Sequence, residues 1–286
     1  MAKQHYGKKP RKSVSAGSHQ ANWLWGQQSV IDTLEADRWR VYELFVTQEV
    51  FEQHADLLQA KQKQGTELEI VLTVRLDELS RTSEHQGIVA RVSKYPYQTQ
   101  DELGIQLRLV QEDTSTPKLL PLVVIVDRIQ DAFNFGAILR CCENAGVCAV
   151  IIGEHCQTQV TPQIARSSSG AVNHISIVKS DDLVAAAKFL QELGLKLVAV
   201  ETDASQIVCD TPLNTPTALI IGSDNHSIEP HLLELCEQRI SVPMQGKIRS
   251  LPSSVLAGIM LYEIRRQQHS TSATLDVSSN DRCQLT

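Results

Sequence analysis

Hydrophobic and polar positions follow two different patterns along the chain, and the first of them covers the N-terminal third. Short apolar runs of strand length alternate there with segments in which apolar residues recur at helical spacing. The expected helices are 27–36 and 50–65, and the expected strands are 41–47, 68–74 and 85–95. Strands that alternate with helices over so short a stretch predict a small α/β domain, which we place at residues 21–96.

The second pattern consists of uninterrupted apolar runs separated by amphipathic segments. The expected strands are 122–127, 148–153, 195–202, 217–224 and 239–244, and the expected helices are 136–146, 182–194, 230–238 and 253–268. A strand that is apolar throughout is typical of a parallel sheet covered by helices on both faces. Residues 121–269 are therefore predicted to form an α/β domain with a mainly parallel sheet.

Three polar segments lie outside these two domains. Residues 1–20 carry five Lys and Arg residues within the first twelve positions, which predicts a disordered basic tail. Two interpretations of this tail are open: it keeps the protein in solution, or it lies along nucleic-acid phosphates. Residues 97–120 have the composition of a linker, within which 103–113 has the spacing of a short helix. The Ser- and Thr-rich residues 270–286 are expected to be disordered.

Composition limits the classes of function. The 286 residues are 42% hydrophobic and carry a net charge of -6, so the chain can bury large cores and any contact with RNA or DNA has to be local. The seven cysteines include no C-x-x-C pair, which indicates neither a zinc site nor a disulfide framework and favours a reducing compartment. No apolar stretch approaches the roughly 20 residues of a membrane span. We expect a cytoplasmic protein with no metal ion and no membrane contact.

The usual signatures of nucleotide-binding and hydrolase sites are absent from the sequence. No G-x-G-x-x-G follows a strand, and neither G-x-x-x-x-G-K-[ST] nor G-x-S-x-G occurs. Chemistry in the second domain therefore has to come from other residues at the carboxyl ends of the strands, where open α/β sheets bind their ligands.

The first group of such residues is the segment DAFNFGAILR, residues 131–140, which follows a buried strand and ends in an arginine. Asn134 stands where a side-chain oxygen could cap the next helix, and Gly136 would allow a close backbone approach. Arg140 follows further along that helix. A plainer interpretation of these residues is open as well, in which Asn134 only caps the helix and Arg140 extends into solvent.

Two further groups follow strands later in the chain. Gly222 ends an apolar run and is followed by Asp224, so that a ligand could lie against bare backbone there, although the same residues could form an ordinary turn. Ser250 is the expected N-cap of the last helix, whose first amide groups suit an anion. The alternative for this helix is a plain amphipathic role, packing on the sheet or on a second subunit.

Together, these segments resemble the SpoU/TrmH family of RNA ribose 2′-O-methyltransferases, a branch of the SPOUT superfamily. The family's first motif, Asn-x-Gly-x-Ile/Leu-x-Arg, is matched at residues 134–140, and RSSSGAVNHISI (166–177) resembles its Ser-x-Gly-Ala segment. The resemblance covers residues 121–268. The preceding domain, which ends in HQGIVARV, resembles the family's ribosomal-protein-like RNA-binding domain.

The resemblance implies a fold, a reaction and a set of site residues. The last strand and helix would thread through a loop to form a deep trefoil knot that holds S-adenosylmethionine, and two subunits would form a homodimer with the site at their interface. The substrate would be a ribose 2′-hydroxyl of RNA, ribosomal RNA in particular because of the N-terminal domain. The implied cofactor-binding residues are Gly222, Val242, Met244 and Leu251. The implied catalytic residues are Asn134, Arg140, Asp224 and Ser250.

The sequence departs from the family pattern at two positions near these residues. Asp224 stands where the family usually has glutamate, and Pro252 stands where it usually has asparagine. The first change shortens a carboxylate by one methylene, and the second removes a side-chain hydrogen bond. They leave an alternative open: a knotted RNA-binding protein that has lost methyl transfer and acts in ribosome assembly.

Overall fold

The chain divides into two compact units, which are described separately below. The computed structural model describes residues 22–112 and 119–280, with side chains up to His269. The first unit comprises the residues up to Gln27 together with Arg40–Lys94, and the second comprises Gln28–Trp39 together with Tyr95 onward. The predicted tail at residues 1–20 lies outside the described residues. Within the described ranges, no helix has both the length and the apolar character needed to cross a membrane.

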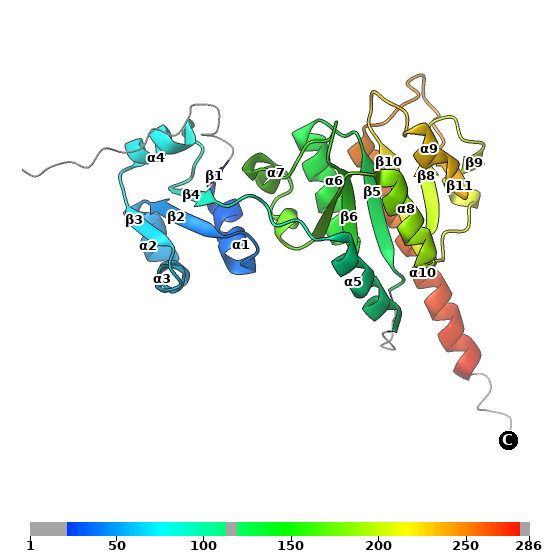
Figure 1. Cartoon of the computed structure of the whole chain (residues 1–286), viewed down its shortest axis with the longest axis horizontal. Helices are drawn as coiled ribbons and strands as arrows, with labels where there is room; N and C mark the ends of the chain where they lie inside the picture. The colour runs from blue at the N-terminus through cyan, green and yellow to red at the C-terminus, as the bar shows by residue number, and fades with distance from the viewer. Residues whose placement is uncertain (1–21, 113–118, 281–286) are drawn as a thin grey trace, which may run out of the picture. The chain divides into compact units, whose positions relative to one another are not determined.

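The first unit is built on a four-stranded sheet in the order β1-β4-β2-β3. Its elements are β1 (Trp23–Trp25), β2 (Val41–Val46), α2 (Gln48–Gln53), α3 (Ala55–Lys63), β3 (Glu67–Ile70), α4 (Thr73–Ser80) and β4 (Ile88–Val92). Strand β4 is antiparallel to β1 and β2, and β3 is parallel to β2. The α/β character predicted for this part of the chain is confirmed (Figure 1).

Two predicted elements of the first unit differ from the structure. The strand expected at 68–74 ends at Ile70, and α4 begins at Thr73 because a helix there buries Leu76 and Ser80 on one face. The helix expected at 50–65 is interrupted at His54, where α2 ends and α3 begins. In LEIVLTV, the local preference of β-branched residues for strands is overridden by packing.

The second unit contains a seven-stranded sheet in the order β7-β6-β5-β10-β8-β11-β9. Its strands are β5 (Leu122–Asp127), β6 (Ala149–Gly153), β7 (Ser176–Ser180), β8 (Lys196–Val200), β9 (Gln206–Ile207), β10 (Thr217–Gly222) and β11 (Gln238–Ser241). Every neighbouring pair is parallel, which confirms the predicted sheet. Since all strands run the same way, the polar residues that follow β5, β8 and β10 meet at one edge of the sheet.

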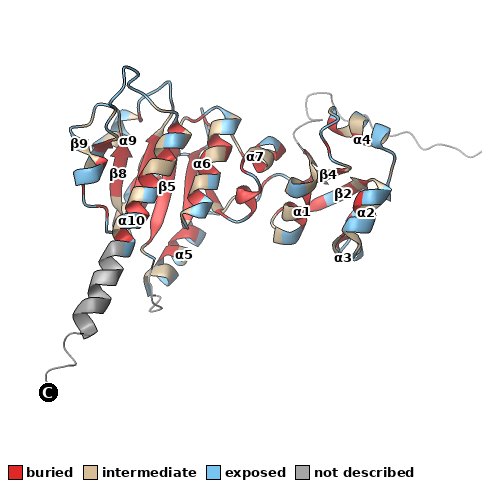
Figure 2. Ribbon diagram, turned by 180° about the vertical axis from the view of Figure 1, so that it is seen from behind, coloured by how far each residue is buried: buried red, intermediate tan, exposed pale blue. Residues whose placement is uncertain are grey.

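Helices cover both faces of this sheet (Figure 2). The longer helices on the sheet are α5 (Gln100–Glu112), α6 (Ala132–Asn144), α8 (Leu183–Glu192) and α10 (Ser253–Asn280), and α9 (Pro230–Glu234) is shorter. Helix α7 (Pro162–Ser167) packs on α6, and α1 (Gln27–Ala36), most of which belongs to the same unit, contacts the segment that follows α7. Helices α5, α8 and α9 share one core with the strands, in which Leu107, Ala187 and Leu232 are completely buried. Helix α10 contacts β10 and packs along α6.

The segment predicted as a linker, residues 97–120, is in part a structural element of the second unit. It contains α5, and the side chains of Leu103 and Leu107, one helical turn apart, are fully buried against the sheet. Gly104 lies so close to α8 that a Cβ there would come within 2.9 Å of Cζ of Phe189. The short helix expected at 103–113 is therefore confirmed as α5, which begins earlier, at Gln100. The linker expected at 97–120 is wrong for this helix, because its apolar face packs on the sheet.

Two boundaries in the structure also differ from those predicted from the sequence. Residues 28–39 belong to the second unit, although the sequence places them in a domain at 21–96: Arg38 Nη1 donates to the carbonyl of Ile175 at 2.7 Å, and Asn173 Nδ2 donates to Thr33 Oγ1 at 3.2 Å. The last helix, expected to end before residue 270, continues to Asn280, since no glycine or proline follows Gly258 to stop it.

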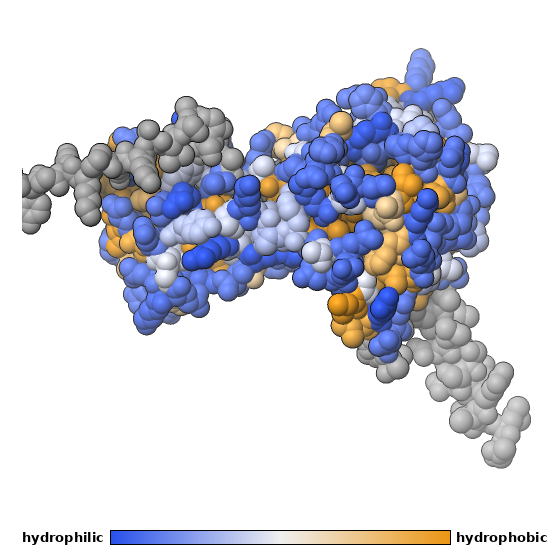
Figure 3. Space-filling model, in the orientation of Figure 1, coloured by the Kyte–Doolittle hydropathy of each residue, from blue (hydrophilic) through white to orange (hydrophobic). Residues whose placement is uncertain are grey.

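The packing of α5 yields a direct test with a matched control on the same helix. Leu107→Ala is expected to lower the free energy of unfolding by about 2–5 kcal/mol, because it leaves a cavity in the core. Leu109→Ala should change it by less than about 0.5 kcal/mol, because Leu109 is 62% exposed. Figure 3 shows apolar residues gathered at the α5 end of the face that it draws. Urea denaturation measures both variants, and equal losses would contradict the burial of α5.

Candidate functional site

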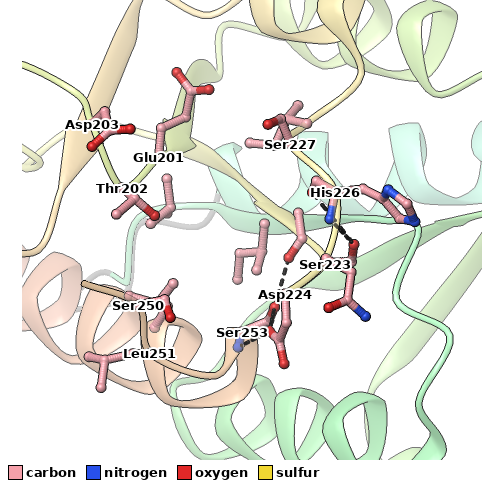
Figure 4. A pocket seen from close by; sticks show the side chains of 16 residues that line it. Glu201, Thr202, Asp203, Ser223, Asp224, His226, Ser227, Ser250, Leu251 and Ser253 are labelled. Atoms are coloured by element: carbon pink, nitrogen blue, oxygen red, sulfur yellow. Dashed lines mark hydrogen bonds between the residues drawn. The ribbon is translucent and has the colours of Figure 1, made fainter. Parts of the chain in front are cut away.

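A cavity of about 360 Å³ lies at the carboxyl ends of β8 and β10. Its wall is formed by Val200–Asp203 at the end of β8, by Ile221–Ile228 at the end of β10, and by residues just before and at the start of α10, including Ser250, Leu251 and Ser253 (Figure 4). The volume is in the usual range for small-molecule sites, and the position is where parallel α/β sheets bind ligands. Four predicted site residues therefore line one cavity: Gly222, Asp224, Ser250 and Leu251.

Gly222 ends β10 at a point where the backbone turns sharply back on itself. A Cβ on this residue would lie 3.0 Å from Cγ1 of Ile228 and 3.4 Å from the carbonyl oxygen of His226. The turn is closed by a hydrogen bond from the His226 amide to Ser223 Oγ at 3.0 Å. A side chain at position 222 would press on the buried side chain of Ile228, so glycine lets this residue lie close to the end of β10.

Asp224 joins the loop after β10 to two helices. One carboxylate oxygen accepts hydrogen bonds from the amide of Ser253, at 2.6 Å, and from its hydroxyl. The other oxygen accepts from Asn134 Nδ2 of α6 at 2.8 Å. The amide oxygen of Asn134 in turn accepts from Ser254 Oγ at 2.7 Å. Residues from the three predicted motifs thus form one hydrogen-bond network beside the cavity.

This network corrects the two helix caps predicted from the sequence. Helix α6 begins at Ala132, earlier than expected, and its N-cap is Asp131, whose carboxylate accepts the amide of Asn134 at 2.7 Å. Asn134 is therefore not a cap, and its side chain is available to Asp224. Helix α10 begins at Ser253, so Ser250 is not its N-cap and is exposed instead.

The start of α10 also shows how the two departures from the family pattern are accommodated. The carbonyl of Pro252 accepts the amides of Val255 and Leu256, at 2.9 and 3.0 Å, so proline begins the helix without any loss of backbone bonding. The aspartate side chain, although shorter than glutamate, reaches the first amide of the helix. Asp224 thus caps α10 from outside and lies at the positive end of its dipole.

The electrostatics of Asp224 follow from these bonds. Partial burial alone would raise the pKa of its carboxyl group, but hydrogen bonds from Ser253 and Asn134 outweigh that effect and lower the pKa below its usual value. The group is therefore ionised at neutral pH. With Glu201 and Asp203 on the same wall, the cavity presents three carboxylates and suits a ligand that carries positive charge.

Four predicted site residues do not line the cavity, namely Asn134, whose bonds are described above, and three others. Val242 and Met244 are half-buried in the segment after β11. Arg140 is exposed on α6, where its Nη1 donates to Ser169 Oγ at 3.3 Å. The close approach expected at Gly136 is confirmed, since a Cβ there would come within 2.8 Å of the Ser167 carbonyl carbon.

Other residues at this edge were missed in the sequence. Glu201 and Asp203 directly follow the apolar run of β8, the same signal that identified Gly222 and Asp224 after β10. Arg128, in the left-handed region with φ of 59°, pairs with the buried carboxylate of Asp127 at 3.1 Å and donates to the carbonyl of Ser227. The bond to Ser227, together with the bond from the Glu229 amide to Oδ2 of Asp127 at 2.8 Å, ties the loop after β5 to the loop after β10.

No cluster of three His, Cys, Asp or Glu side chains with the geometry of metal ligands occurs among residues 22–112 and 119–269. The three carboxylates at the cavity are instead spread along its wall, where each can contact a different part of a ligand.

Comparisons with known proteins bear on both units. Residues 121–262 match the family model described as the SpoU rRNA Methylase family, and residues 23–98 match the one described as RNA 2'-O ribose methyltransferase substrate binding. The "Putative TrmH family tRNA/rRNA methyltransferase YacO" of Bacillus subtilis is 30% identical over 88% of this chain and 98% of its own length. The 23S rRNA (guanosine-2'-O-)-methyltransferase RlmB of Yersinia pestis is 30% identical over 86% of this chain and 97% of its own.

Solved structures share the fold. The SpoU methyltransferase AviRb from Streptomyces viridochromogenes superposes with a TM-score of 0.70 at 22% identity, covering 88% of this chain and 91% of that one. At this identity the likeness concerns the arrangement of helices and strands.

The capping role of Asp224 predicts a pH-dependent loss of stability. Its folded-state pKa is lowered, so its contribution is present above the unfolded pKa of about 3.9 and is lost as the pH falls through the folded value. At pH 7, Asp224→Asn keeps an acceptor but loses the charge, so it should lower the free energy of unfolding by about 0.3–1 kcal/mol, as for a charge removed from a helix N-terminus, and this difference from the unchanged protein should vanish in acid. Denaturation at a series of pH values measures it. The control is Asp203→Asn, which removes a carboxylate from the same wall but not from the start of a helix; an equal loss of stability at pH 7 would contradict the capping role of Asp224.

Proposed function

The chain belongs to the SpoU rRNA methylase family, and from this membership we propose that it transfers a methyl group from S-adenosylmethionine to a ribose 2′-hydroxyl of ribosomal RNA. The observation that carries the proposal is the network of Asn134, Asp224, Ser253 and Ser254 beside the cavity. It links the family's first motif to the loop after β10 and to the last helix. The network forms although positions 224 and 252 depart from the family pattern. This argues for the enzyme over the RNA-binding alternative.

The cavity fits the cofactor in size, position and charge. S-adenosylmethionine carries a sulfonium and an ammonium group, and the wall offers the carboxylates of Glu201 and Asp203. We assign Gly222 and Leu251 to the wall that holds the cofactor through backbone groups. We also assign Val242 and Met244 to cofactor binding. They lie on the segment between β11 and α10, and in this proposal that segment forms part of the trefoil knot.

The chemistry that the bound cofactor supplies is an electrophilic methyl group on sulfur. The protein has to align the ribose hydroxyl with it and to favour loss of the hydroxyl proton. Arginine is a weak base, with a pKa above about 12 in water, so Arg140 acts mainly through its charge. Bound to a neighbouring phosphate, its guanidinium lowers the pKa of the 2′-hydroxyl. Asn134 and Asp224 hold α6 and α10 in place around the reacting groups, and the exposed hydroxyl of Ser250 is available to the substrate at the rim.

The proposal includes a homodimer, because the site of a single chain is incomplete. Arg140 does not line the cavity of its own chain, and the helices near it expose apolar side chains. Phe133, seven residues before Arg140 on the same face of α6, is 68% exposed. Val255 and Tyr262, which share a face of α10, are 44% and 71% exposed. Pairing these faces of two chains would bury them and bring Arg140 of one chain toward the cavity of the other.

Methyl transfer is tested with labelled S-adenosylmethionine, ribosomal RNA and nucleotide mapping. Label in a 2′-O-methylated nucleotide is the expected result. Arg140→Ala should reduce transfer more than about 100-fold, as for other groups that stabilise charge in a transition state, while the cofactor Kd from calorimetry stays within about twofold. Arg108→Ala, which removes an exposed arginine from α5, should transfer at the normal rate. Cofactor binding without label in any RNA would favour the RNA-binding alternative.

The homodimer has its own test. Tyr262→Glu places a charge on the apolar face of α10 and should convert a dimer into a monomer in light scattering coupled to size exclusion. Leu72→Glu, at a residue of the first unit that is 81% exposed, should leave the mass unchanged. A monomeric unchanged protein, or a dimeric Tyr262→Glu variant, would contradict the proposed interface.

A further inference from the structure

The turn that follows α7 contacts Arg140 and has no role in the mechanism above. Ser169 and Gly170 both adopt the left-handed conformation, with φ of 51° and 83°. Two such residues in succession reverse the chain between α7 and the short 3-10 helix Ala171–Asn173. The reversal places the hydroxyl of Ser169 within 3.3 Å of Arg140 Nη1.

One side of this turn is fixed to α6. The hydroxyl of Ser167 donates to the carbonyl of Ala132 at 3.0 Å, and the absence of a side chain at Gly136 lets the two backbones approach. Ser168 is fully buried and donates to the carbonyl of Ala165 at 3.1 Å. The turn therefore has little freedom to move along the helix that carries Arg140.

The other side of the turn rests on α1, within the same compact unit. Glycine is favoured here by the backbone angle, and a Cβ on Gly170 would lie 2.5 Å from Oδ2 of Asp32, so a side chain would displace this carboxylate. The residues just after the turn are bonded as well: Asn173 to Thr33, and the carbonyl of Val172 to the hydroxyl of Tyr95 at 3.0 Å.

We propose that Ser169 is a positioning residue for Arg140, and that α1, through Asp32, supports the turn that presents it. The inference rests on the proposed function of Arg140. Within the described part of the chain, Ser169 is the hydrogen-bond partner of the Arg140 guanidinium. An exposed arginine samples many rotamers, and a bond to one of its five N–H groups restricts them while leaving the others for a phosphate. The loss of orientation should lower kcat and leave cofactor binding unchanged.

The first test is Ser169→Gly, which removes the hydroxyl and suits the left-handed backbone better than serine. Stability should be equal or higher, while kcat should fall about three- to tenfold, the equivalent of one hydrogen bond, with an unchanged KM for S-adenosylmethionine. Ser169→Asn, which tolerates this conformation and keeps a side-chain acceptor, should restore part of kcat. An unchanged kcat in Ser169→Gly would overturn the inference.

A readout independent of methyl transfer separates this inference from the proposed function. The ¹⁵N relaxation of the Arg140 Nε–H group reports the mobility of the guanidinium, and Ser169→Gly should lower its order parameter. If the unchanged protein transfers no methyl group, the proposed function fails and relaxation still decides on the positioning role. Equal order parameters in the two proteins would exclude it.

The support from α1 is tested with two glycines of nearly the same backbone angle. Gly170→Ala and Gly194→Ala carry similar backbone strain, at φ of 83° and 81°, but no atom lies within 4 Å of a Cβ at position 194. Only Gly170→Ala should lower kcat and the order parameter of Arg140. Adding Asp32→Ala to it relieves the close contact and should restore part of both. Equal behaviour of the two single variants would exclude the role of α1.

Discussion

The carboxylate of Asp224 is the interaction on which the site depends. It accepts the first amide and the first hydroxyl of α10 and also the side chain of Asn134, so a single charged group determines where the last helix begins and how it meets α6. Pro252 cannot supply a side-chain cap, and the aspartate from another strand end takes that place. The same carboxylate therefore positions both the cavity wall at the start of α10 and Asn134 of the first motif. A movement of either one would disturb the other.

The features predicted from the sequence were those that depend on short stretches of chain. The runs 122–126 and 218–221 are apolar throughout, and burial on both faces leaves a parallel sheet as their natural arrangement. Polar residues after such runs must gather at one edge, which is why Gly222 and Asp224 could be found without the structure. The same reasoning applied to the run before Glu201 would have found that residue and Asp203 too.

The features that were missed depend on contacts between distant residues. Asn134 and Ser250 have the side chains of helix caps, yet Asp131 and Asp224 take these roles because of where the helices begin. Helix α5 lies in a polar stretch, and only the position of the sheet shows that Leu103 and Leu107 have a core to enter. The bond from Asp224 to the start of α10 and the burial of Leu107 against the sheet both join segments that are far apart in the sequence. The spacing of residues along the chain therefore does not predict them.

The left-handed backbone at Ser169 has a consequence for engineering thermal stability. Replacing a non-glycine residue at positive φ with glycine is a standard way to relieve strain, and Arg81, with φ of 58° at the end of α4, is a suitable place for it. Ser169 meets the same geometric criterion, but its hydroxyl contacts Arg140. A protocol guided by backbone angles alone would select both positions, and at the second it would trade precision at the site for a more stable fold.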